Sequence, residues 1–297
     1  MKITLAIVTK DRTKKLSRCL KSISNQEVSP DQLVIIDNDP NASAKKIVDR
    51  NKSLPQTKYY LCTDQGVPKA RNMALKLCKT EILAFVDDDC VLDKNWIKQC
   101  FVGFKNKKTD FVVGKTKLYN NKNLIALATH VRHDYWFKYN LERNNRPHPF
   151  NLDTKNIAIK THKINKIKIK FDSKISIGWY DSADTDFGFQ LESNNMFGSY
   201  NKNMIVSHEE GEKALLYLKK AYYRGKLAAI LTKKWEIKNE YISSTTLNPK
   251  TILHRIKNIP SEYQGYTKKQ KIKKTAKIKT YLLIKAFDTF FKFGYLS

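Results

Sequence analysis

The feature that most constrains this chain is the stretch from Glu81 to Cys90, where an apolar run leads directly into three consecutive aspartates. An unbroken apolar run of strand length, bounded by polar residues, is typical of a strand buried on both faces. The carboxylates cannot share that burial, because an unpaired charge in an apolar interior costs much free energy. We therefore expect Asp87, Asp88 and Asp89 at the carboxyl edge of a sheet, where open α/β proteins bind their ligands.

Three adjacent acids also indicate what accompanies them. Carboxylates this close repel one another, so a cation or several strong hydrogen-bond donors is expected between them. Oxygen ligands of this kind suit Mg²⁺ or Mn²⁺, which proteins usually share with substrate phosphates. A solvated acidic turn that binds nothing is the alternative.

The first hundred residues alternate between two patterns. Short apolar runs predict strands at 3–8, 32–36 and 58–61. Helical spacing of apolar residues predicts helices at 16–23 and 44–51, and the stretch 64–72 is expected to open a third helix through Met73, Leu75 and Leu77. Asp11 or Thr13 could cap the first of them. Such alternation predicts an α/β fold in which a mostly parallel central sheet has helices on both faces.

Acids and basic residues recur where these predicted strands end, which is the position of a nucleotide site. The glycine-rich loops GxGxxG and GxxxxGK[ST] are absent from the expected places, so Rossmann dinucleotide enzymes and P-loop NTPases are disfavoured. Asp37 or Asp39 could accept a hydrogen bond from a base or ribose, and Arg71 could bind a diphosphate at a helix start. A turn-capping pair of acids and a surface arginine are the simpler alternatives.

Three segments together resemble the family 2 glycosyltransferases of GT-A fold, which have a Rossmann-like, mostly parallel sheet. They are IIDNDP at 35–40, Gly66 through Ala-Arg-Asn at 70–72, and FVDDD at 85–89. The resemblance implies transfer of a sugar, with inversion, from a nucleotide diphosphate donor (most often UDP) with Mn²⁺ or Mg²⁺ as cofactor. The donor-binding residues expected on this basis are Thr9, Asp37, Asp39, Arg71, Asp87 and Asp88, and Asp89 is expected to bind the metal.

A second acidic stretch lies between Gly178 and Phe189. Inverting transfer needs a carboxylate that takes the proton of the attacking hydroxyl, while a cation stabilises the departing diphosphate. The family motif is Glu-Asp-x-Asp at a helix start, and the resemblance therefore implies that Asp184 is the base. Ala183 stands where the family has Glu, and Asp181 could supply the missing carboxylate.

Simpler interpretations of this stretch stay open. Asp181, Asp184 and Asp186 could merely stabilise the positive end of the following helix. Trp179 and Tyr180 are candidate acceptor residues, since they could offer a flat face to a sugar ring, or they could pack in the core.

The middle of the chain is less regular. We expect a strand pair at 111–114 and 116–119, a strand at 156–160, and an edge strand or turn region at 163–170. A strand is also expected at 205–208. The family resemblance suggests that His208, at the end of that strand, completes the metal site beside Asp89, and a neutral imidazole is a reasonable ligand. A structural histidine is the alternative.

Charge is the outlier of the composition, with 56 Lys and Arg against 28 Asp and Glu and a net charge of +28. Such a field favours anionic partners. The lysine-rich segment 268–279 precedes the apolar and aromatic segment 281–295, a pattern typical of an interfacial membrane anchor. A helix docked on the catalytic domain is the alternative.

Neither a signal peptide nor a run of about 18 apolar residues is found, so the protein is expected to be soluble or to lie on a surface. The five cysteines, without CxxC spacing, fit a reducing cytosol. We therefore expect a cytoplasmic protein, peripheral at the inner face of the cell membrane.

The predicted domains are a GT-A catalytic domain at 1–212, with a nucleotide-binding half at 1–90 and an acceptor half at 91–212, and a helical basic extension at 213–297. The predicted function is metal-dependent transfer of a sugar to a glycan or lipid-linked acceptor in surface polysaccharide synthesis. A nucleotidyltransferase, a glycan- or nucleotide-binding pseudoenzyme and a nucleic-acid-binding protein are the alternatives. Nucleic acid is not the expected partner, because the acid clusters would repel its phosphates.

Overall fold

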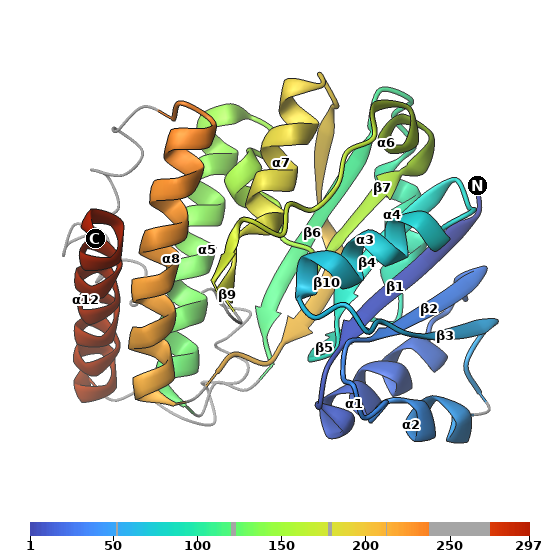
Figure 1. Cartoon of the computed structure of the whole chain (residues 1–297), viewed down its shortest axis with the longest axis horizontal. Helices are drawn as coiled ribbons and strands as arrows, with labels where there is room; N and C mark the ends of the chain where they lie inside the picture. Colours follow the sequence, from blue (N-terminus) through green and yellow to red (C-terminus); the bar gives the residue numbers. More distant parts are fainter. Residues whose placement is uncertain (52, 120–122, 178–179, 212, 238–273) are drawn as a thin grey trace. The chain divides into compact units, whose positions relative to one another are not determined.

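A computed structural model describes the chain except residues 52, 120–122, 178–179, 212 and 238–273 (Figure 1). It forms two compact units. The first contains Met1–Tyr119 and Asn140–His208, and the second contains Asn120–Tyr139 and Glu209–Ser297. Residues 120–139 thus group with the C-terminal residues, whereas the boundary at residue 212 stays a prediction.

The first unit is built on an eight-stranded sheet of order β3-β2-β1-β4-β7-β6-β10-β5. Its first half contains the predicted parallel strands, which are β1 (Ile3–Thr9), β2 (Gln32–Asp37), β3 (Thr57–Leu61) and β4 (Ile82–Asp87). The connecting helices are α1 (Thr13–Ser24), α2 (Lys45–Arg50) and α3 (Val67–Leu77). The predicted α/β architecture of this half is confirmed.

The second half of the sheet is mixed. The predicted strand at 156–160 is β7 (Ile157–Lys160), which runs antiparallel to both β4 and β6 (Phe111–Leu118). The next strand, β10 (Gly198–His208), is parallel to β6, and β5 (Cys90–Leu92) is antiparallel to β10. The helices of this half are α4 (Trp96–Gly103), α6 (Thr161–Ile167) and α7 (Ala183–Ser193). A small hairpin, β8 (Ser176–Ile177) and β9 (Tyr180–Asp181), precedes α7.

Three local predictions were wrong. The strand pair at 111–119 is the single strand β6, because Gly114 allows a close approach of Asn156 and Met204 rather than making a turn. The edge strand or turn at 163–170 is mainly α6, whose Ile164 is buried. Neither Asp11 nor Thr13 caps α1, since Arg12 occupies the N-cap position without a capping side-chain bond.

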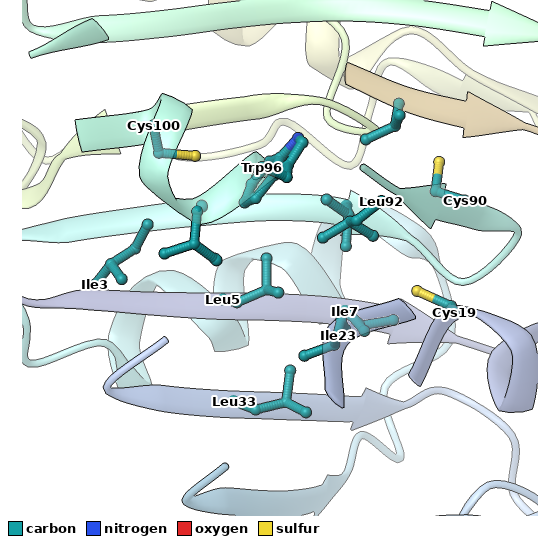
Figure 2. Packing of buried hydrophobic residues seen from close by; sticks show 14 of the residues in the cluster. Ile3, Leu5, Ile7, Cys19, Ile23, Leu33, Cys90, Leu92, Trp96 and Cys100 are labelled. Carbon is teal, nitrogen blue, oxygen red and sulfur yellow. The ribbon is translucent and has the colours of Figure 1, made fainter. Parts of the chain in front are cut away.

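One face of the sheet packs against α1, α2 and α4. Ile3, Leu5 and Ile7 of β1 point to this face. They belong to one buried cluster with the fully buried Trp96 (Figure 2). The indole nitrogen of Trp96 donates to Asn156 Oδ1 at 2.9 Å, which satisfies its only polar group. This packing fixes the strands whose carboxyl ends carry the acids.

The opposite face of β4 carries Phe85, which is 2% exposed. Its ring contacts Phe171 edge-on at 5.8 Å, and Phe171 stacks on Phe187 of α7 at 4.3 Å. Burial of each such side chain stabilises the fold by roughly 1.5–3 kcal/mol. The three rings therefore connect the strand that ends in the aspartates to α7.

The second unit contains α8 (Ala214–Lys234), α12 (Lys274–Leu296) and the first part of α5 (Leu124–Asn144). Gly225 of α8 and Gly294 of α12 face the backbone of the opposite helix so closely that a Cβ at either would overlap it. Arg132 Nε pairs with the buried Asp288 Oδ1 at 2.9 Å and lies over Phe287. None of the helices in the described residues has an apolar stretch that would reach across a bilayer.

Candidate functional site

Predicted site residues of the first unit gather where its strands end. Thr9, Asp37 and Asp87 are the last residues of β1, β2 and β4, which are neighbouring parallel strands, and His208 is the last residue of β10. Parallel strands bring their carboxyl ends to one edge of the sheet. The arrangement therefore provides polar side chains along a single edge.

A cluster able to hold a divalent cation lies at this edge. One ligand atom each of Asp87, Asp89 and His208 lies within 4.8 Å of the others. Ligands about 2.1 Å from an octahedral Mg²⁺ are roughly 3 Å apart when adjacent, and Asp89 Oδ1 is 3.2 Å from His208 Nε2. Two carboxylates and an imidazole so placed could hold a divalent cation, and the carboxylate oxygens suit Mg²⁺ or Mn²⁺.

Cations surround Asp89, and the sequence interpretation missed two of them. Arg12 Nη1 is 3.1 Å from Asp89 Oδ2, and Lys15 Nζ is 3.6 Å from the same oxygen. Burial disfavours the charged form, but His208 and Arg12 hold the pKa of Asp89 well below its usual range. Asp89 is therefore an anion at neutral pH, as a metal ligand must be.

Asp88 faces the loop after β1. Its carboxylate accepts a hydrogen bond from Thr9 Oγ1 at 2.7 Å and pairs with Arg12 Nη1 at 3.1 Å. Burial raises the pKa of Asp88 to about 6, in spite of Arg12. These contacts tie the start of α1 to the end of β4. The donor-binding roles of Thr9 and Asp88 stay predictions.

The loop after β2 is organised by its own acids. Asp37 is fully buried and accepts hydrogen bonds from the backbone of Asp39 and Ala44 and from the Tyr59 hydroxyl, at 2.9–3.1 Å. Asp39 accepts from the amide of Asn41 at 3.0 Å. These contacts match the turn-capping alternative, and a contact of either acid with a nucleotide stays a prediction.

Arg71, on α3, connects the end of β4 to the start of α7. Its Nη1 is 3.2 Å from Asp181 Oδ1, and its Nη2 is 4.0 Å from Asp87 Oδ1. The guanidinium lies over the Phe171 ring at 5.6 Å from its centroid and is 9% exposed. Arg71 is therefore a buried cation between two groups of carboxylates, rather than the surface arginine of the alternative interpretation.

The predicted base, Asp184, lies in the first turn of α7. Burial, with the charges of Asp153 and Asp181, raises the pKa of Asp184 to about 7, although Arg71 acts in the opposite direction. A carboxyl group that exchanges its proton near neutral pH is suited to general-base catalysis. Asp186 instead is fully buried and accepts from Gln190.

Asp153 was also missed by the sequence interpretation. It pairs with the buried Lys155 and raises the pKa of Asp184 and of Asp87 through its charge. No motif in the sequence points to it, apart from its position just before the strand at 156–160.

The candidate acceptor residues have different outcomes. Tyr180 is half-buried in the β9 hairpin, next to Asp181. Trp179 lies outside the described residues. Ala183 is fully buried, and its amide donates to Asp181 Oδ1 at 3.3 Å. Asp181 thus contacts both the start of α7 and Arg71. Its contact with an acceptor stays a prediction.

Comparison with known families gives a match over more than half of the chain. The family model described as glycosyl transferase family 2 matches residues 4–164. A similar curated protein is poly(ribitol-phosphate) beta-N-acetylglucosaminyltransferase TarP of Staphylococcus aureus (strain N315), 27% identical over 118 residues. That match covers 38% of this chain and only 36% of TarP.

Solved structures share the fold. The mannosyltransferase PcManGT from Pyrobaculum calidifontis, in complex with GDP-Man and Mn²⁺, gives a TM-score of 0.66 at 12% identity, over 97% of this chain and 86% of that one. Residues 1–349 of S. aureus TarS give a TM-score of 0.55 at 16% identity, over 98% of this chain and 90% of that one. A longer TarS structure gives 0.54 at 17%, over 86% of this chain but only 47% of that one. The predicted GT-A fold is confirmed.

Proposed function

The chain belongs to glycosyl transferase family 2, and we propose that it transfers a sugar from a nucleotide diphosphate donor to a hydroxyl of a glycan or lipid-linked acceptor in surface-polymer synthesis. The observation that carries the proposal is the pairing of two acidic sites in one unit. Asp87, Asp89 and His208 fit a divalent cation, and Asp184, in the group that Arg71 joins to Asp87, has a pKa raised to about 7.

Each group has a role in this proposal. A cation bound at Asp87, Asp89 and His208 would supply positive charge to the departing diphosphate. Arg71 adds a second positive charge, held by Asp87 and Asp181. Asp184 accepts the proton of the attacking hydroxyl, so that the nucleophile forms as it displaces the diphosphate from the opposite face.

The donor and acceptor are proposed from the relatives. TarS structures are solved with UDP and with UDP-GlcNAc, and TarP is named for poly(ribitol-phosphate). A uridine diphosphate sugar and an anionic phosphate-bearing polymer are therefore the first pair to test. The net charge of +28 supports an anionic acceptor.

The test is a calorimetric screen of nucleotide diphosphates, with and without Mn²⁺ or Mg²⁺, on the wild type and on Asp89→Ala. We expect one diphosphate to bind only with the metal, and the variant, which lacks one metal ligand, to lose most of that metal-dependent affinity. Metal-independent binding, or none, would contradict the proposal. Turnover then distinguishes an enzyme from a pseudoenzyme, and steeply salt-dependent RNA binding would favour the nucleic-acid alternative.

We also propose that the second unit binds an anionic lipid surface at the inner face of the cell membrane. Apolar side chains of α8 and α12 are exposed, among them Leu215, Phe293 and Leu296, which is 82% exposed. All charged residues of α8 are basic, and Asp288, the single acid of α12, is buried in its pair with Arg132. Like charges would oppose packing of two copies through these faces, whereas anionic headgroups complement them.

Vesicle flotation tests this surface. The wild type should float with vesicles that contain phosphatidylglycerol and not with pure phosphatidylcholine, and the variant Phe293→Ser/Leu296→Ser should float less. Binding that is independent of lipid charge, or a dimer that the double variant abolishes, would contradict it.

A further inference from the structure

We infer that Asn72 is a positioning residue that holds α7, and with it Asp184, against the donor side of the site. The inference rests on the proposed function, in which Asp184 is the base. It assigns to the Ala-Arg-Asn segment a role beyond the nucleotide binding that the family resemblance implies.

Asn72 fastens the segment that leads to α7. Its Nδ2 donates to the carbonyl oxygen of Phe171 at 2.8 Å, and its Oδ1 accepts from the amide of the same residue at 2.8 Å. A side chain that bonds both polar groups of one residue fixes the position and the direction of the backbone there. The contact spans 99 residues of sequence, so it joins α3 to a distant part of the chain.

Phe171 transmits this position to the helix. Its ring is 1% exposed and stacks on Phe187, which is 0% exposed, at 4.3 Å with an interplanar angle of 9°. Phe187 lies in the same helix as Asp184, one turn further on. Interiors pack too closely for one of these rings to move alone, so a displaced Phe171 would displace α7.

Arg71 acts on the same region through charge. It pairs with Asp181, which accepts a hydrogen bond from the amide of Ala183 at the start of α7. Its other terminal nitrogen lies near Asp87, at the end of β4. The adjacent residues Arg71 and Asn72 therefore hold the loop and the helix start by two independent contacts. Only Arg71 also faces the proposed metal cluster, so a change at Asn72 separates positioning from donor binding.

The expected effect of losing Asn72 is on the chemical step. A displacement of about 1 Å of a reacting group can cost about 100-fold in rate. Asn72→Ala should keep the affinity for the nucleotide diphosphate within about twofold but lower kcat by about 10- to 100-fold. Asn72→Asp keeps the acceptor for the Phe171 amide but turns a carboxylate oxygen toward the Phe171 carbonyl oxygen, so it should not restore the rate.

The matched control is Asn201→Ala. The Nδ2 of Asn201 also donates to a distant backbone carbonyl, that of Gln99 at 2.8 Å, and is half-buried. Loss of the Asn201 side chain should lower the free energy of unfolding about as much as loss of the Asn72 side chain, on the order of 1 kcal/mol for one hydrogen bond. It should leave kcat unchanged. A general loss of stability in Asn72→Ala therefore cannot imitate the expected result.

The experiment measures three quantities on the wild type and the variants. They are calorimetric Kd for UDP with Mn²⁺, kcat with UDP-GlcNAc and poly(ribitol phosphate), and hydrogen exchange of the amides of α7. In Asn72→Ala we expect unchanged Kd, reduced kcat and faster exchange in α7, with none of these changes in Asn201→Ala.

Two results would overturn the inference. They are a weaker Kd with unchanged kcat at saturation, which would make Asn72 a nucleotide ligand, and unchanged exchange in α7. If the wild type itself gives no transfer and binds no nucleotide diphosphate, the proposed function fails. Faster exchange in α7 of Asn72→Ala would still show the positioning contact in that case.

Discussion

Asp89 at the end of β4 and Asp184 at the start of α7 are both aspartates in acidic clusters of one unit, yet their environments act in opposite directions. His208, Arg12 and Lys15 surround Asp89 and hold its pKa low. Around Asp184, burial and the charges of Asp153 and Asp181 outweigh Arg71 and raise its pKa to about 7. The ratio of cations to acids thus separates a permanent anion from a group that can take up a proton.

The largest expected effect concerns the base itself. Asp184→Asn removes the proton acceptor and keeps the shape, so kcat should fall by about 10²–10⁴-fold while metal-dependent binding of the nucleotide diphosphate persists. Steady-state kinetics and calorimetry measure the two. Asp186→Asn, in the same turn of α7, keeps an acceptor for Gln190 and should retain most of the activity. A comparable loss in both variants would indicate damage to the helix instead of loss of a base.

The dependence of kcat on pH measures the raised pKa of Asp184 directly. Because the base must be deprotonated, kcat should decline as the pH falls through about 7. Asp153→Asn removes a negative charge that raises this pKa, so the midpoint should move down by roughly half a unit to one unit. A midpoint that stays in place, or rises, would mean that Asp153 does not act on the base.

The melting temperatures of variants at Asp184 and Asp89 should change in opposite directions, and these changes are smaller than the effect on kcat. The pKa of Asp184 is raised from 3.8 to about 7 on folding, so its carboxylate destabilises the fold as the pH rises through that window. Asp184→Asn should therefore melt about 2–4 °C above the wild type at pH 8, and the gain should vanish near pH 4.

Asp89 should behave in the opposite way. Its pKa is lowered on folding, so its charged form stabilises the fold above the unfolded value of 3.8, and this stability is lost as the pH falls. Asp89→Asn should lower the melting temperature at pH 8. Equal signs for the two variants in metal-free scanning calorimetry would contradict the comparison.

The sequence predicted one side of this comparison better than the other. Apolar runs depend on local periodicity, so β1, β2 and β4 could be placed from the sequence, together with the acids that end β2 and β4. Arg12, Lys15 and Asp153 could not, since each acquires its meaning from a partner more than thirty residues away. Alternating Lys and Ile at 163–170 fits a strand, yet tertiary packing of Ile164 gives the helix α6.

The glycine crossing of the second unit has a consequence of its own. Gly225 and Gly294 leave room for backbone against backbone, and every neighbouring residue of α12 carries a Cβ. Sliding α12 by one turn, about 5.4 Å, would bring a side chain such as Phe290 or Phe291 into that space. The close contact of the two helices thus allows the register in which Gly225 and Gly294 face the opposite backbone and opposes a shift by one turn. Because neither glycine has a Cβ, the last residues of the chain keep a defined position along α8.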